Sequence, residues 1–198
     1  SDCLVGSEMC IRDSLNINHI PEEVVNKLQL IIIDSFGLMV SAKNEPYIKS
    51  LIDALQEHGD CTLVGHNKKV NPFNASIING TAIHGKDFDD TFEGTPVHIG
   101  SVMVPAILSS AQAKNLDGQK FLKGLVVGSE LICRLALVAP TAVHRQGFHP
   151  TAIFGAFGSS IGVSSLLGNT INEMSSGLGI VGSMASGIIE YLAEGTST

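Results

Sequence analysis

The sequence of 198 residues contains no tryptophan, and aromatic residues make up only 5% of it. Basic residues are also few: 12 lysines and arginines stand against 19 acidic residues, which gives a formal net charge of −7. They are scattered along the chain, so they form no extended cationic surface for a phosphate backbone. Nucleic acid is therefore not an expected partner, and an anionic substrate would need a locally positive site.

Cysteine is scarce as well. The four cysteines show neither CxxC pairing nor the density of a secreted disulfide scaffold: Cys3, Cys10, Cys61 and Cys133. Reduced thiols and a cytoplasmic location are expected. The first twenty residues lack a continuous apolar segment behind a basic start, so no signal peptide is predicted. The opening SDCLVGSEMCIRDS, residues 1–14, is predicted to be a non-native leader without a functional part.

Charged residues are absent between Gln146 and Asn172. This stretch nevertheless contains His149, Pro150 and Asn169 together with many serines and glycines, so its apolar part falls short of the roughly 20 residues of a membrane helix. We expect a buried helix in a helical core rather than a membrane span.

Hydrophobic residues make up 44% of the chain, which is enough for a substantial core. Their helical spacing predicts an all-α fold, with one short extended segment at 61–65. The expected helices cover residues 21–42, 47–57, 72–88, 104–114, 118–138, 150–167 and 171–192. Small residues crowd the last two, which predicts central helices packed closely on one another.

The sequence GLGIVG, residues 177–182, satisfies the GxGxxG pattern of dinucleotide-binding folds. The preceding NEMSS is not a strand, and an acidic residue about twenty positions further on is missing from the sequence. Close helix packing therefore explains these glycines better than a cofactor site does.

The segment HGKDFDDTFEGTPVHIG, residues 84–100, combines two histidines, four acidic residues and two threonines. If the helix that begins at residue 72 continues through it, His84, Asp87 and Thr91 share one face by their i, i+3 and i, i+4 spacing. Asp89 and Asp90 would then point elsewhere. The alternative of a merely solvated helix end is weakened because helix C-termini disfavour acidic side chains.

A second segment, HRQGFHPTAIFG, covers residues 144–155. Pro150 suits the first position of a helix, which leaves His149 at the cap position beside free backbone N–H groups. His98 lies similarly, ahead of the helix that contains Pro105. Because helix starts favour bound carboxylates, we expect both histidines and the acidic helix face to form one joint site.

A metal centre is a competing interpretation of these residues. His84, Asp87, one further acid and His98 would make a mixed nitrogen and oxygen set suited to zinc, iron or manganese. The sequence shows no recognised ligand spacing, so a site without metal is favoured.

Three segments together resemble the MmgE/PrpD family: INGTAIHGKDFDDTFEGTPVHIGSVMVPAILSSA, GFHPTAIFGAFGSS and SGIIEYLAEGTST. PEEVVNKLQLIIIDSFGLMVSA is similar to the first long helix of that family, which includes 2-methylcitrate dehydratase, cis-aconitate decarboxylase and iminodisuccinate epimerase. The resemblance implies that residues 15–198 form part of a compact multi-helix domain. It also implies a smaller α+β lid further along the chain, a homodimer, and no metal or cofactor.

The family motifs assign catalytic residues by position: Asp87, Thr91, His98 and His149. We hypothesise that His98 and His149 bind substrate carboxylates, one of them also acting as general acid or base, and that Arg145 adds positive potential. Asp87 would orient a histidine or act as a base, and Thr91 would donate a hydrogen bond. In the family a lysine follows EGTxT at once, and this sequence stops at Thr198, so the piece alone is expected to be inactive.

The resemblance implies a metal-independent lyase that acts on a small di- or tricarboxylate. A 2-methylcitrate dehydratase-like reaction, proton abstraction beside a carboxylate with loss of water, is the main expectation. Cis-aconitate decarboxylase-like and iminodisuccinate epimerase-like enzymes are the alternatives within the family. A catalytically silent helical interaction module and a metal-dependent hydrolase are alternatives of other classes.

Overall fold

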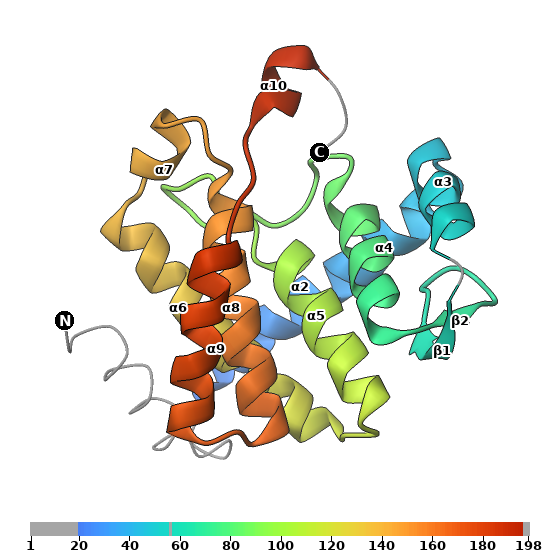
Figure 1. The fold of residues 1–198 in the computed structure, drawn as a ribbon, viewed down its shortest axis with the longest axis horizontal. Helices are drawn as coiled ribbons and strands as arrows, with labels where there is room; N and C mark the ends of the chain where they lie inside the picture. The colour runs from blue at the N-terminus through green and yellow to red at the C-terminus, as the bar shows by residue number, and fades with distance from the viewer. Residues whose placement is uncertain (1–19, 56, 196–198) are drawn as a thin grey trace.

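The computed structural model describes residues 20–55 and 57–195, and the predicted leader at residues 1–14 lies outside them. The elements are α2 (Glu22–Ala42), α3 (Pro46–Ala54), β1 (His58–Thr62), β2 (Lys69–Val70), α4 (Pro72–His84), α5 (Gly100–Ala113), α6 (Gly118–Val138), α7 (Ala142–Arg145), α8 (Pro150–Leu167), α9 (Ile171–Met184) and α10 (Glu190–Glu194). Figure 1 shows a helical bundle with the small β1–β2 hairpin at its edge. The all-α prediction is confirmed.

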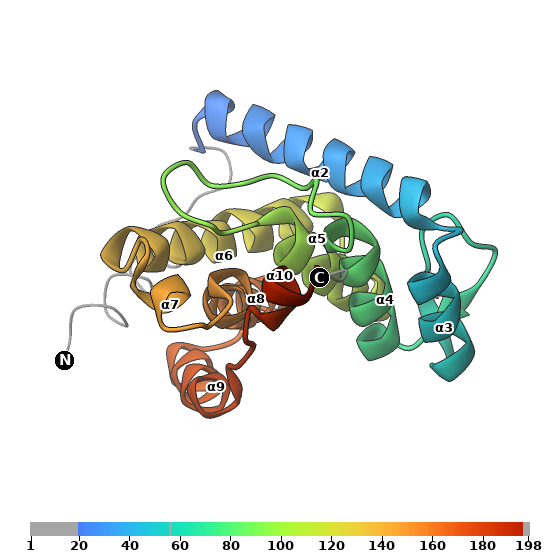
Figure 2. The ribbon, with the colours of Figure 1, turned by 90° about the horizontal axis from the view of Figure 1, so that it is seen from above.

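The helices lie in layers, with α2 along one side and α9 along the other (Figure 2). Between them lie α4, α5, α6 and α8, and α8 packs against α5, α6 and α9. The central position predicted for residues 150–167 is therefore confirmed. The same prediction was wrong for α9, which buries only Met174 and lies on the outside of the bundle.

Four glycines, called the glycine seam below, let α6 and α8 approach until their backbones touch: Gly124, Gly128, Gly158 and Gly162. A Cβ atom added at Gly128 would lie 2.6 Å from the carbonyl oxygen of Gly158, and one at Gly158 would lie 2.9 Å from that of Gly128. Side chains of the main core fill the space beside the seam, among them Met103, Ile107 and Ile132. Any larger residue in the seam would push the helices apart.

The predicted start of α4 at residues 71–72 is confirmed. Pro72 occupies the first turn, and the side chain of Asn71 accepts a hydrogen bond from the backbone N–H of Asn74 at 2.8 Å. This N-cap satisfies one of the free amides at the helix start.

The predicted end of α4 and start of α5 were wrong. Helix α4 ends at His84, because Gly85 is its C-cap and Asp87 adopts a positive φ of 54°, which a helix cannot accommodate. Helix α5 begins at Gly100, and Pro105 lies inside it. The carboxylate of Asp90 accepts hydrogen bonds from the amides of residues 99 and 100, so the helix starts well before its proline.

The predicted helix over 171–192 is also shorter in the structure. Helix α9 ends at Met184, and Gly187 has a φ of 128° that interrupts helical geometry before the short α10. Between them Ile188 forms an antiparallel bridge with Phe148, just ahead of α8. Pairing with this distant segment replaces the helix that the local sequence favours.

Two described helices, α2 and α8, are long and apolar enough to cross a membrane by length and composition alone. The core helix of a soluble protein passes the same test, and 56% of the tested window of α8 is buried. The corresponding share for α2 is 17%, because it exposes residues such as Leu30, Ile33 and Val40. The absence of a membrane span stays a prediction.

Candidate active site

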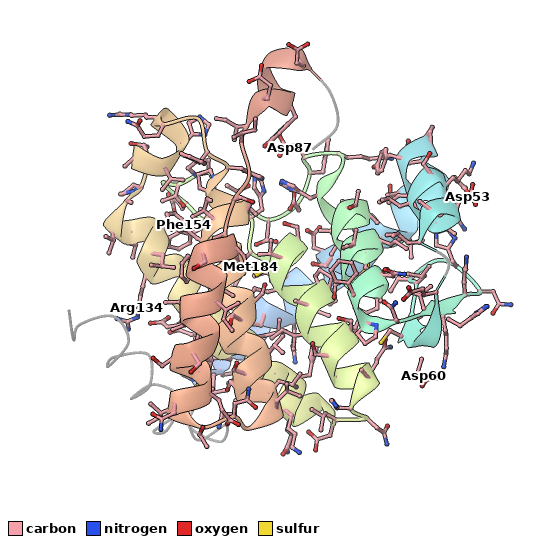
Figure 3. All side chains as sticks on the ribbon, in the orientation of Figure 1. Asp53, Asp60, Asp87, Arg134, Phe154 and Met184 are labelled. Carbon is pink, nitrogen blue, oxygen red and sulfur yellow. The ribbon has the colours of Figure 1, made fainter. Side chains whose placement is uncertain are left out.

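Three imidazoles and two carboxylates converge where the end of α4 meets the starts of α5 and α8. This histidine–aspartate cluster consists of His84, Asp87, Asp89, His98 and His149. The ring centroid of His84 lies 4.8 Å from that of His98 and 5.3 Å from that of His149. Figure 3 shows Asp87 at this end of the bundle, next to α10. Asp87, His98 and His149, three of the site residues predicted from the sequence, thus lie close together.

Asp89 forms the centre of the cluster. Its side chain is fully buried, and its carboxylate oxygens lie 2.9 and 3.1 Å from Nδ1 of His84 and 3.3 Å from Nδ1 of His98. Burial alone would raise the pKa of Asp89, but the hydrogen bonds and charges of the two histidines outweigh it and hold the pKa well below its usual range. The prediction that Asp89 points elsewhere was wrong, because the chain turns after His84 instead of continuing as a helix.

His84 joins Asp89 to His149. The Nε2 atoms of the two histidines are 3.0 Å apart, and the planes of their rings differ by only 11°, so the rings meet edge to edge through one hydrogen bond. Sequence reasoning placed His84 on the shared helix face and in the metal alternative, and did not name it among the catalytic residues. Its position in the same segment, five residues ahead of Asp89, was the available signal.

His149 is the N-cap residue of α8, as predicted, although its side chain makes no capping hydrogen bond. Burial, reinforced by the neighbouring His84 and His98, lowers the pKa of His149 to about 4. Its ring is therefore neutral at pH 7. The ring of Tyr191 in α10 meets it edge-on, with centroids 5.5 Å apart.

His98 has the opposite electrostatic character. Burial would lower its pKa, but the hydrogen bond to Asp89 and the charges of Asp89 and Asp87 raise it above the ordinary value. Its Nε2 atom lies 3.7 Å from Asp87, and its side chain is 13% exposed. Its backbone N–H donates to the buried hydroxyl of Thr151 at 3.0 Å, which ties the start of α5 to the start of α8. The surroundings of His98 thus favour its imidazolium form.

Asp87 and Thr91 reach the cluster from the loop, not from the predicted helix face. Asp87 follows α4 in a left-handed conformation, and 52% of its side chain is exposed. The hydroxyl of Thr91 lies 3.4 Å from Nδ1 of His98 and donates to the backbone carbonyl of Asp89 at 3.4 Å. Their proximity to His98 is as expected, whereas the i, i+4 reasoning that led to it was wrong.

The loop between α4 and α5 is held by Asp90. Its carboxylate accepts hydrogen bonds from the backbone N–H of Gly100 at 2.8 Å and of Ile99 at 3.3 Å. Burial is the main cause that raises its pKa. A side chain at Gly100 would collide with this carboxylate. Asp90 therefore positions the site without belonging to the cluster.

A segment from the far end of the described chain closes over His149. The backbone N–H of His149 donates to the carbonyl of Gly187 at 2.9 Å, and the N–H of Ile189 donates to the carbonyl of Gly147 at 3.1 Å. These bonds bring Tyr191 to the site, which sequence reasoning missed. Glycines at 147 and 187, both with positive φ, are the only local signal for this bend among the described residues.

Arg145 lies exposed in α7. Within residues 20–55 and 57–195, no hydrogen bond or ion pair joins its side chain to the cluster. Its predicted contribution to substrate binding stays a prediction.

Four residues of the cluster could together hold a metal ion. His84, Asp87, Asp89 and His98 each offer one ligand atom, and these atoms lie within 4.8 Å of one another. This is the mixed nitrogen and oxygen set of the metal alternative. Two of these ligands, His84 and His98, already pair with Asp89 in the structure.

The fold and the cluster together define an all-helical domain with a titratable polar site at one end of its bundle. The chain belongs to the MmgE/PrpD family: the family model of the MmgE/PrpD N-terminal domain matches residues 12–198. The resemblance recognised in the sequence is thereby confirmed.

Curated relatives carry a more specific name. The chain is 27% identical over 203 residues to the "Cis-aconitate decarboxylase-like protein oryM" of Aspergillus oryzae. The matched region covers 96% of this chain and 42% of that protein. The chain is 25% identical to the cis-aconitate decarboxylase of Aspergillus terreus, over 93% of this chain and 40% of the other. It is 28% identical to the cis-aconitate decarboxylase of Mus musculus, and the match covers 92% of this chain and 39% of that protein. The chain thus spans about two fifths of the length of these relatives.

Proposed function

We propose that this chain carries part of the active site of a lyase of the cis-aconitate decarboxylase type. The single observation behind this proposal is the convergence of His98 and His149 around His84 in one cluster, in which the pKa of His98 is raised and that of His149 is lowered. The names of the curated relatives favour decarboxylation over the dehydration that was our main expectation from sequence. A 2-methylcitrate dehydratase-like reaction becomes the second candidate, since both reactions need an anion site beside a proton-transfer group.

The chemistry sets two requirements. When an unsaturated tricarboxylate loses CO₂ from the carbon next to its double bond, the electron pair of the broken carbon–carbon bond forms a new double bond to the nearer carbon of the existing double bond. The electrons of that double bond then take up a proton at its far carbon. One proton is consumed for each CO₂ released, so the site must anchor carboxylates and deliver one proton to carbon.

His98 meets the first requirement. Its raised pKa favours the imidazolium form, which can pair with a carboxylate through charge-assisted hydrogen bonds. The Thr91 hydroxyl lies beside it as a further hydrogen-bonding group. The starts of α5 and α8, joined through Thr151, add partial positive charge at the same place.

His149 meets the second requirement. Its pKa of about 4 applies to the cluster alone, where two other imidazoles disfavour a further positive charge. A bound tricarboxylate would bring negative charge next to the ring and raise its pKa towards neutrality. His149 would then be protonated only when substrate is present, which suits a general acid.

Turnover assays test the proposal. The full-length protein is incubated separately with cis-aconitate, 2-methylcitrate and iminodisuccinate, and we expect CO₂ release from cis-aconitate. His149→Ala should lower kcat by ~10²-fold or more. An unchanged kcat in this variant would remove the acid–base role. Absence of turnover by the full-length protein with all three substrates would favour the silent interaction module.

We further propose a homodimer, a cytoplasmic location and catalysis without metal, as the family resemblance implies. Sedimentation analysis tests the first, and metal analysis of the purified active protein tests the last: a stoichiometric metal would favour the hydrolase alternative.

A further inference from the structure

Asp89, His84 and His149 form a continuous hydrogen-bonded chain from the interior to the start of α8. Asp89 is fully buried, and both its carboxylate oxygens lie within 3.1 Å of Nδ1 of His84. The other ring nitrogen of His84 lies 3.0 Å from Nε2 of His149. Neither Asp89 nor His84 is among the catalytic residues that the family motifs assign to this sequence.

This geometry determines where the protons lie. Asp89 is ionised and can only accept, so Nδ1 of His84 must carry a hydrogen. Only one proton fits between the two Nε2 atoms. When His84 is neutral its Nε2 carries the lone pair, and His149 must donate from Nε2. A neutral His149 then has its lone pair on Nδ1, because the hydrogen bond of one ring nitrogen sets the state of the other.

We propose that Asp89 and His84 are positioning residues that fix which ring nitrogen of His149 carries the proton. Their arrangement leaves Nδ1 of His149 as the nitrogen that exchanges protons. Among residues 20–55 and 57–195, no hydrogen bond occupies this atom. The acid–base role of Nδ1 rests on the proposed function, whereas the tautomer assignment does not.

The chain also gives a place for the charge of a transferred proton. When Nδ1 of His149 gains a proton, its Nε2–H bond can break as a new N–H bond forms at Nε2 of His84. The positive charge then rests on His84, beside the ionised Asp89. When Nδ1 gives its proton away, the shift reverses, and the number of protons in the pair returns to its starting value.

The surroundings of His149 favour this arrangement. The charged or titratable groups around it are His84, His98, Asp87, Asp89 and Tyr191. Both rings lie near His98, whose ring centroid is 4.8 Å from that of His84, but Nδ1 of His84 also lies 2.9 Å from the carboxylate of Asp89. This contact would stabilise a transferred positive charge by Coulomb attraction.

Nitrogen-15 NMR of the histidine rings tests the proposal on this chain without any substrate. In long-range proton–nitrogen spectra at pH 7.5, we expect His84 to be protonated at Nδ1 and His149 at Nε2. Assignment rests on the loss of one set of signals in His84→Gln and of another in His149→Gln. A His149 protonated at Nδ1, or a His84 protonated only at Nε2, would overturn the proposal even if every variant at Asp89 failed to fold.

The matched pair Asp89→Leu and Asp87→Asn tests the cause. Leucine offers no acceptor, so His84 should change to the Nε2–H tautomer, and His149 should change with it to Nδ1–H. Among the described residues, His98 is the one imidazole within ion-pair distance of Asp87, so Asp87→Asn should leave the tautomers of His84 and His149 as they are. If Asp89→Leu is folded by circular dichroism and His149 keeps its wild-type tautomer, the positioning role is wrong.

Turnover separates this proposal from the proposed function. In a form of the protein active on cis-aconitate, His84→Leu should lower kcat by at least tenfold with little change in KM, because it removes the partner of Nε2 of His149 and leaves the pair between Asp89 and His98 in place. Linked tautomer changes without any lyase activity would retain the positioning role and remove the proposed function. Lyase activity without linked tautomer changes of His84 and His149 would retain the proposed function and remove the positioning role.

Discussion

The glycine seam and the histidine–aspartate cluster are both built on α8, but different forces specify them. In the middle of α8, Gly158 and Gly162 bring two backbones into contact among apolar side chains, so volume decides the fit. At its start, His149 and Thr151 join groups whose charges must be balanced. The seam should therefore respond to a single methyl group and not to pH, and the cluster should respond to pH.

The largest effect is expected in the seam. Gly128→Ala places a Cβ atom 2.6 Å from the carbonyl of Gly158, where rigid backbone cannot yield. We expect the free energy of unfolding to fall by about 3 kcal/mol, the upper part of the range for overpacking. Urea denaturation measures it. The control is Gly179→Ala in exposed α9, where no atom lies within 4 Å and stability should rise by up to about 1 kcal/mol. Similar losses in both would break the comparison.

The pH dependence of stability should come from the cluster. The pKa of His149 is about 4 in the folded protein and near 6.5 when unfolded. Between these values the unfolded chain binds a proton that the folded chain does not. Its share of stability therefore falls by about 2–3 kcal/mol as the pH drops from 6.5 to 4. The raised pKa of His98 affects stability in a different pH range. Its contribution to the free energy of unfolding is complete below pH 6.5 and is lost as the pH rises through the folded pKa.

The measurement is urea denaturation at several pH values between 4 and 7. His149→Gln should flatten the dependence in this window, while the seam variant Gly128→Ala should shift the whole curve without changing its slope. A slope that is unaffected by His149→Gln would show that another group dominates the pH dependence of stability. The cluster would then not differ from the seam in the way proposed.

A smaller effect is expected where the two helix starts meet. Thr151→Val removes the acceptor of the His98 backbone N–H and leaves that amide without its protein partner in a buried place. We expect a loss of about 1–2 kcal/mol. Thr151→Ser keeps the hydroxyl and should retain most of the stability. Equal losses in the two variants would assign the role of Thr151 to its methyl group and not to the hydrogen bond.

The sequence predicted the helix packing better than it predicted the geometry of the polar site. The many small residues of the segment now seen as α8 predicted a close approach, because helix packing follows directly from side-chain volume along a periodic surface. The N-cap position of His149 also followed from local rules, since Pro150 can occupy a helix only at its start.

The geometry of the cluster depends on the turn after His84, which the hydrophobic periodicity of the sequence does not predict. Extending α4 beyond Gly85 put Asp89 on the wrong side, and the left-handed backbone at Asp87 reverses that result. Tyr191 was out of reach for another reason: it arrives through backbone pairing between residues about forty positions apart, and such pairing has no side-chain signature. The assignment of Asp87, Thr91, His98 and His149 came from family motifs, which encode the folded arrangement indirectly.

The backbone of Asp87 has a consequence for how this position would respond to selection. A φ of 54° is uncommon for any residue with a side chain, and glycine would adopt it with less strain. A library screened only for heat resistance should therefore enrich glycine at position 87, whereas one screened for catalysis should return the acid. The two winners would differ at a single codon, and their divergence would report how much folding stability the protein gives up to keep a carboxylate there.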